Sequence, residues 1–144
     1  MSIAYSAVVL NELTRGNLLA MLNNAIPMGW EVIAHHMTIT MGPLVHPKES
    51  KRLKGHDYSS FGMPGTPVDL PVIAVGMDDR AMAVQVSPPA PISKKIAFPH
   101  VTVAVNRDGG GKPFHSNKIP PENFQNISHL GIVLKGTVVE VPQA

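Results

Sequence analysis

The chain has 144 residues, with a hydrophobic share of 44%, a charged share of 15% and a formal net charge of +2. This composition is that of an ordinary globular domain and excludes an intrinsically disordered chain, and so small a charge gives no support to a protein that tracks along nucleic acid. The length suits one domain, which can be two-lobed around a cleft. Without any cysteine, disulfides, a thiol nucleophile and thiolate metal sites are also excluded.

A first strand is expected at residues 3–10, an apolar and β-branched run that precedes a polar residue. On this strand Tyr5 either points toward a ligand cleft or packs at a sheet edge. Residues 11–26 then predict an amphipathic helix with Asn11 as its N-cap, because apolar residues recur at helical spacing on one face. Pro27 ends this pattern.

The strand expected at residues 30–42 carries the first notable motif. His36 and Thr38 are two positions apart, so both side chains project from one face of a strand, with Met37 on the other face. His35 is expected to face away from His36, as a surface or second-layer residue. A zinc site at the two histidines is not expected, because a helical His-x-x-x-His pattern and a nearby carboxylate cluster are missing.

Residues 43–67 break the pattern with prolines, glycines and a basic patch, which predicts a long surface loop. Two interpretations stay open for it: a flap that brings positive charge or the rings of Tyr58 and Phe61 to a nucleotide, or a solvated, mobile face. Two strands at residues 70–76 and 81–87 are expected to follow as a hairpin.

The motif returns in the strand expected at residues 97–106. There His100 and Thr102 share one face, and Val101 lies on the other. The proline-rich residues before this strand leave no second long helix between the two motifs. The glycine-rich residues 106–113 predict a mobile hairpin in preference to a phosphate-binding loop, since the Walker spacing and a following helix are absent.

The last third of the chain predicts two more strands, at residues 130–134 and 137–141. Before them, the polar residues 114–118 are candidates for the rim of a cleft, because they are close in sequence to the second motif. Mostly antiparallel β structure with at least one good helix, an α+β fold, is therefore expected.

Two strands of this kind side by side would aim two imidazoles and two hydroxyls into one gap. Imidazoles titrate near neutral pH, so the two can act as general base and general acid on opposite sides of a phosphorus, while hydroxyls donate to its oxygens. One such motif is weak evidence, because Thr favours strands and a single His there is commonly structural. Two copies favour an active site, since each buried polar pair costs stability unless it is satisfied or used.

The two runs His36-Met37-Thr38-Ile39 and His100-Val101-Thr102-Val103 together resemble the double His-x-Thr-x signature of the 2H phosphoesterase superfamily. The resemblance implies a two-lobed, β-rich α+β fold in which each lobe contributes one motif strand to a central cleft. It also implies catalysis without metal or cofactor. The catalytic residues that it implies are His36, Thr38, His100 and Thr102.

A small chain of this kind is similar to the free-standing members of that superfamily, which include phage anti-CBASS nucleases and RNA-end cyclic phosphodiesterases. The resemblance implies a metal-independent phosphodiesterase that cleaves the 3'-5' bonds of cyclic oligonucleotide signals, with Tyr5 stacking on a base. The alternatives are a 2',3'-cyclic phosphodiesterase acting on RNA ends or nucleotides, a non-catalytic nucleotide- or RNA-binding module, and a structural domain whose motifs are incidental.

A cytoplasmic protein without a membrane partner is expected, in the host cytoplasm if the chain comes from a phage. The first residues lack the basic segment and apolar stretch of a secretory leader. No apolar run approaches the roughly 18 residues that span a bilayer.

Overall fold

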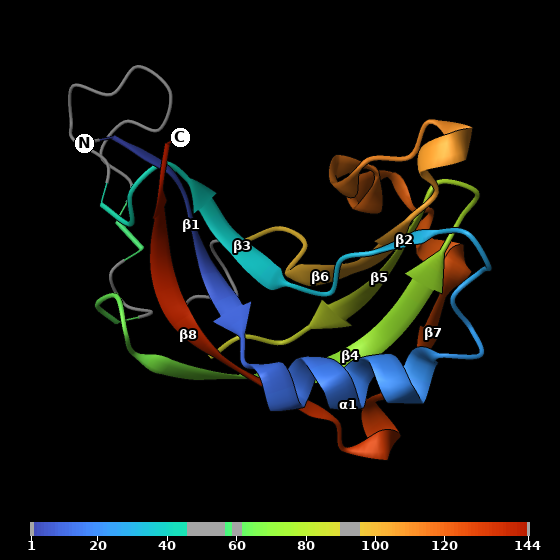
Figure 1. Cartoon of the computed structure of the whole chain (residues 1–144). Helices are drawn as coiled ribbons and strands as arrows, with labels where there is room; N and C mark the ends of the chain where they lie inside the picture. The colour runs from blue at the N-terminus through green and yellow to red at the C-terminus, as the bar shows by residue number, and fades with distance from the viewer. Residues whose placement is uncertain (1, 46–56, 59–61, 90–95, 144) are drawn as a thin grey trace.

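Figure 1 shows the computed structural model, which describes residues 2–45, 57–58, 62–89 and 96–143. Its strands and its α-helix are β1 (Ile3–Leu10), α1 (Glu12–Leu22), β2 (Glu31–Val32), β3 (His36–Met41), β4 (Pro67–Met77), β5 (Ala81–Val86), β6 (His100–Val105), β7 (Phe124–Asn126) and β8 (Val133–Pro142). Short 3₁₀ turns connect the later strands: η3 (Arg107–Gly109), η4 (Pro113–Lys118), η5 (Pro121–Asn123) and η6 (Ser128–Leu130). No helix in these ranges is long and apolar enough to cross a membrane.

The strands form one sheet that returns on itself. Its path runs β2-β6-β3-β1-β8-β4-β5, and β5 pairs again with β6, while β7 pairs with β4. All of the pairs named are antiparallel. In Figure 1, β1, β3 and β8 rise on one side and β2, β5 and β6 on the other, with α1 across the base. The expected α+β fold with mostly antiparallel sheet is therefore confirmed.

The first strand and the helix follow the sequence pattern closely. Strand β1 has the predicted bounds, and the Asn11 side chain accepts a hydrogen bond from the Thr14 amide at 2.8 Å, as an N-cap does. Leu18 and Leu22 are buried in the core, which gives the helix its apolar face. The helix ends at Leu22, earlier than predicted. The amides of Ala25 and Ile26 both donate to the Leu22 carbonyl, which closes a final turn.

The single strand predicted at residues 30–42 is wrong, because the chain changes partners midway. Strand β2 pairs with β6, and the amides of Ile33 and Ala34 continue along β6 by donating to the carbonyls of Val103 and Thr102. Ala34 then adopts a φ of +42°, which is uncommon for a residue with a side chain. After this turn, β3 pairs mainly with β1.

The predicted hairpin is confirmed as β4 and β5, with β4 beginning earlier, at Pro67. The two strands predicted at residues 130–134 and 137–141 are instead one strand, β8, preceded by η6. Gly136 does not interrupt β8, and its missing side chain admits β1, since a Cβ there would lie 2.6 Å from the Val9 carbonyl oxygen.

The two loops also differ from the predictions. Residues 106–113 do not form a hairpin: they fold into η3, where the Asn106 side chain accepts from the Gly109 amide and the Asn106 carbonyl accepts from Gly111. In the long loop, Tyr58 is buried in the core, so its ring is not presented to a nucleotide. Phe61 and the basic patch of that loop lie outside the described residues.

Candidate active site

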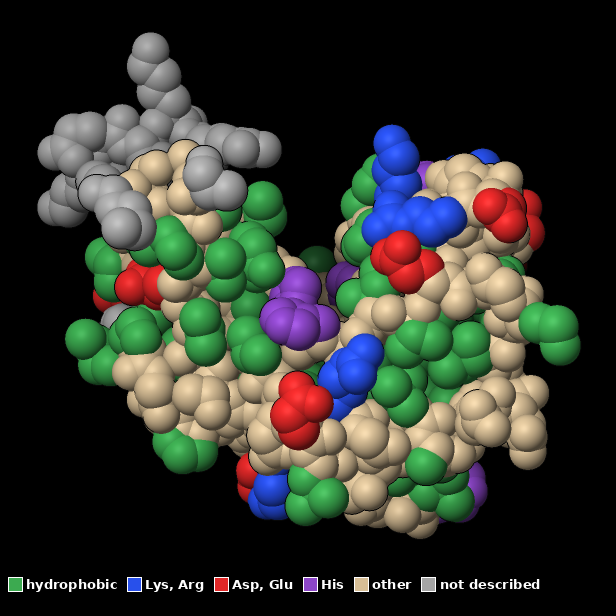
Figure 2. Space-filling model, viewed as in Figure 1, with side chains coloured by type: hydrophobic (Ala, Val, Ile, Leu, Met, Phe, Trp, Pro, Cys, Tyr) green, Lys and Arg blue, Asp and Glu red, His purple; other side chains and the backbone are tan. Residues whose placement is uncertain are grey.

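The two His-x-Thr motifs meet at one cleft. The cleft has a volume of about 530 Å³, and His36, Thr38, His100 and Thr102 all line it. Figure 2 shows histidine side chains in the hollow between the two raised sides of the molecule. Apolar side chains and two further polar residues, Thr40 of β3 and Asn117 of η4, complete the wall, and none of its described residues is a Lys, Arg, Asp or Glu.

Strand alternation sets the direction of these side chains. Met37 and Val101, the central residues of the two motifs, are direct partners across β3 and β6, and both are fully buried. The residues directly before and after them, His36, Thr38, His100 and Thr102, must therefore point to the opposite face, where the cleft lies. Pairing at the central positions is what aligns the two motifs side by side.

A bulge next to this pair brings His35 against His36. The Ala34 amide donates to the Thr102 carbonyl, and Met37 pairs with Val101. Thr102 and Val101 are consecutive in β6, so His35 and His36 are extra residues without partners on that strand, as in a β-bulge. The two rings lie 5.1 Å apart edge to face, with their Nδ1 atoms at 2.9 Å. His35 is exposed, as predicted, but it does not face away from His36. Alternation fails because His35 precedes β3.

The His100 imidazole is oriented by Phe98, which lies two residues before it in the chain. Its Nδ1 lies 2.8 Å from the Phe98 carbonyl oxygen, and since a carbonyl only accepts, Nδ1 carries a proton and donates. The Phe98 ring stacks on the imidazole with centroids 4.5 Å apart and planes at 18°. Burial lowers the pKa of His100 below 6.5, and the bond to the Phe98 carbonyl opposes this by favouring the charged form. The other ring nitrogen, Nε2, remains for a ligand.

The His36 imidazole is also held by an aromatic ring and by a contact at Nδ1, but the causes that shift its pKa differ from those at His100. The Tyr5 ring stacks on His36 with centroids 5.2 Å apart, and His35 meets its Nδ1. Burial, followed by the neighbouring positive charges of His35 and His100, lowers the pKa of His36 to about 4. His36 is therefore neutral at pH 7. The charge of His100 is the smallest of these three causes.

The two threonines differ in their surroundings. Thr38 is exposed, and its hydroxyl has no partner among the described residues, so it is available to a ligand. The hydroxyl of Thr102 is nearly buried and lies 2.8 Å from that of Ser116, a fully buried residue of η4. When Ser116 donates in this bond, the Thr102 hydroxyl donates to the Pro113 carbonyl at 3.4 Å, a long bond that an anion in the cleft could replace.

Tyr5 occupies a place that neither sequence interpretation described. Its ring covers one face of His36, but it is not among the residues that line the cleft. The sequence prediction missed Phe98, and it placed Ser116 only in the candidate rim, without its bond to Thr102. For Phe98 a signal existed, because it is two residues before His100 and so shares its face in an extended chain. For Ser116 there was none beyond its place in the predicted rim, which Phe114 and Asn117 do line.

No protein-family model matches this sequence, and neither a curated protein nor a solved structure gives a significant match. The resemblance to the 2H phosphoesterases therefore rests on the two motifs. Over the described ranges, no three His, Cys, Asp or Glu side chains are grouped so that they could hold a metal ion.

Proposed function

We propose that this protein is a phosphodiesterase that cleaves a nucleotide P–O bond by general acid–base catalysis between His36 and His100. One observation carries the proposal: both imidazoles and both threonine hydroxyls line the same cleft. Each imidazole is engaged at Nδ1, which leaves its Nε2 for a substrate. The two-lobed organisation of the 2H superfamily, with β3 and β6 as its motif strands, belongs to the same proposal.

His36 is the general base and His100 the general acid. A base must be neutral before the reaction, and burial lowers the pKa of His36 to about 4. An acid must hold a proton, and the Phe98 carbonyl favours the charged form of His100. When the pair shares one proton, that proton therefore resides on His100.

The same roles serve two substrates. On a 3'-5' linkage, His36 takes the proton of the ribose 2'-hydroxyl, the oxygen attacks phosphorus, and the 5'-oxygen leaves with a proton from His100. On a 2',3'-cyclic phosphate, His36 takes a proton from water, which attacks phosphorus, and His100 protonates the departing ribose oxygen. In both reactions the acid and the base exchange protonation states.

The threonines stabilise the charge that gathers on the phosphate oxygens. The free hydroxyl of Thr38 donates from one strand and that of Thr102 from the other, backed by Ser116. Donors fixed in place before the reaction are most effective where charge develops in the transition state. The absence of Asp and Glu from the described wall of the cleft suits an anionic substrate.

The experiment that tests the function is an assay of the purified chain in EDTA with two substrate classes. These are cyclic oligonucleotides, which carry 3'-5' linkages, and 2',3'-cyclic mononucleotides. We expect turnover of the cyclic oligonucleotides, the substrate implied by the superfamily's free-standing phage members. Turnover of the 2',3'-cyclic mononucleotides alone would assign the second substrate class. Binding without turnover of either class would make the protein a recognition module and overturn the enzyme proposal.

The two pKa shifts predict an acidic optimum. As the pH rises through about 4, His36 loses its proton and becomes an active base, so kcat/KM increases. As the pH rises further, His100 loses its proton below 6.5 and can no longer act as the acid, so kcat/KM decreases. We expect a bell-shaped profile of kcat/KM with its maximum on the acidic side of pH 6.5. A maximum above pH 7 would contradict the assignment of acid and base.

A further inference from the structure

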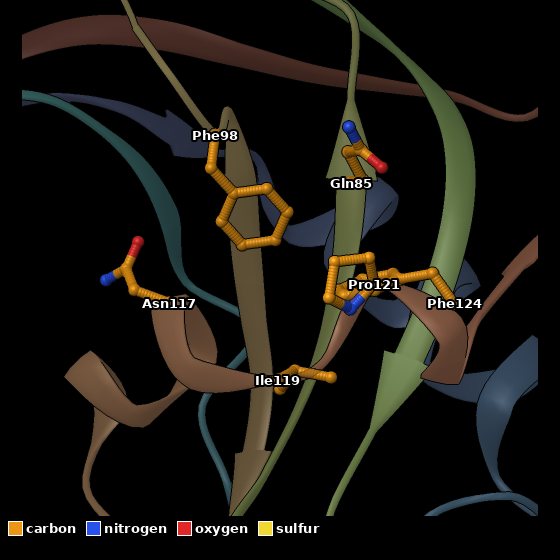
Figure 3. Close-up of a pocket in the computed structure, with 6 residues that line it drawn as sticks. All are labelled: Gln85, Phe98, Asn117, Ile119, Pro121 and Phe124. Carbon is orange, nitrogen blue, oxygen red and sulfur yellow. The ribbon is translucent and has the colours of Figure 1, made fainter.

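A second pocket adjoins the catalytic cleft. It has a volume of about 350 Å³ and is lined by Gln85, Phe98, Asn117, Ile119, Pro121 and Phe124. Two of these, Phe98 and Asn117, also line the catalytic cleft, so the two spaces share a wall. In Figure 3 the Phe98 ring lies between Asn117 on one side and Gln85, Pro121 and Phe124 on the other. The two spaces are therefore direct neighbours, with Phe98 and Asn117 between them.

The lining suits a flat, uncharged group. The rings of Phe98 and Phe124 meet edge to face, with centroids 5.5 Å apart and planes at 76°. Ile119 is buried and adds an aliphatic surface, and none of the described residues that line the pocket is charged. Aromatic and aliphatic walls with a few polar groups are typical of small-molecule sites, whose volumes begin at roughly 300 Å³.

Gln85 supplies the polar group. It lies on β5 directly opposite His100 in the register of β5 and β6, and it is half-buried. Among the described residues its carboxamide has no hydrogen-bond partner, so both its donor and its acceptor are available. A carboxamide can bond to a heterocycle edge that presents a donor beside an acceptor, as the adenine edge does.

We propose that this pocket binds a nucleobase of the substrate whose phosphate lies between His36 and His100. The inference rests on the proposed function and names the part of the substrate that the second pocket recognises. The shared wall supports it, since Phe98 stacks on His100 with centroids 4.5 Å apart and lines both spaces. Phosphate and base are thus bound on either side of one ring, and Gln85 reads the edge of the base.

The test measures binding of nucleotides against a probe that lacks a base. Adenosine, guanosine, cytidine and uridine 3'-monophosphates are titrated calorimetrically into the wild type, Gln85→Met and Gln125→Met, with ribose 5-phosphate as the base-free probe. Gln85→Met keeps the length of the side chain and removes its polar end. Gln125 is the matched control, an exposed glutamine on β7 that lines neither pocket.

We expect at least one nucleotide to bind the wild type at least tenfold more tightly than ribose 5-phosphate. Gln85→Met should weaken the binding of that nucleotide about five- to tenfold, as the loss of a hydrogen bond does, and leave the binding of ribose 5-phosphate unchanged. Gln125→Met should bind every probe as the wild type does. Phe124→Leu, which keeps a large apolar side chain, should weaken every nucleotide and not the base-free probe.

Three results would overturn the inference, and only the third also overturns the proposed function. If nucleotides bind no better than ribose 5-phosphate while the protein turns over its substrate, the nucleobase site is refuted and the phosphodiesterase proposal stands. The same holds if Gln85→Met behaves like Gln125→Met. If no phosphate compound binds and no substrate is turned over, the proposed function fails and the nucleobase site falls with it.

Discussion

His100→Asn is expected to lower kcat/KM by about 10²- to 10⁴-fold, the usual contribution of a positioned acid or base. An asparagine amide can still donate to the Phe98 carbonyl, which accepts from His100 at 2.8 Å in the native protein. It cannot transfer a proton to a leaving oxygen, so the loss would be chemical and not structural. The measurement is turnover of the active substrate class near the optimum pH, with the thermal midpoint recorded on the same sample.

His36→Asn should give a loss of similar size, because the base is as necessary as the acid. The double variant should lose little more than either single variant, since residues that act as one unit are strongly non-additive. His129→Asn is the matched control, because His129 lies exposed in η6 and lines no catalytic surface. It should retain the wild-type rate.

The rates and ligand affinities of these histidine variants distinguish an enzyme from a recognition module. If both single variants keep the wild-type rate, the two imidazoles do not carry the reaction, and the assignment of the cleft is wrong. If His36→Asn weakens ligand binding while the wild type never turns over substrate, the cleft is a recognition site. A decrease in rate at unchanged thermal midpoint is the result that supports acid–base catalysis.

Local patterns predicted the elements whose causes are local. Strand β1, the Asn11 cap and the β4–β5 hairpin follow from period-two apolar runs, a capping side chain and a turn sequence. The break at Ala34 does not follow from any such pattern, because alanine carries no signal for a positive φ. It arises where the chain leaves β6 for β1, and that choice of partner depends on the whole sheet.

The contrast between local patterns and long-range pairing also explains which residues of the candidate site could be predicted. His36, Thr38, His100 and Thr102 could be grouped from sequence, because strand alternation assigns a face without knowledge of the partner. Gln85 could not be found, and Ser116 could be placed only within the rim of residues 114–118, since the two reach the site through the pairing of β5 with β6 and the packing of η4. The contact of His35 with His36 was mispredicted, because alternation does not apply in a bulge.

Met37→Ala is expected to lower the free energy of unfolding by about 2–5 kcal/mol, the range for truncation of a large buried aliphatic side chain to alanine. Met37 is fully buried in the main core and is the partner of Val101 where β3 meets β6. Alanine would leave a cavity behind the catalytic face, at the point that aligns the two motifs. The measurement is urea unfolding followed by circular dichroism.

Met41→Ala is the matched control, since Met41 ends the same strand with 56% of its surface exposed. Its effect on unfolding should stay within about 0.5 kcal/mol, as is usual for surface positions. Equal effects at the two methionines would mean that Met37 is not in the core. The alternation of β3 would then be reversed, His36 and Thr38 would point inward, and the cleft could not hold the substrate between the two histidines.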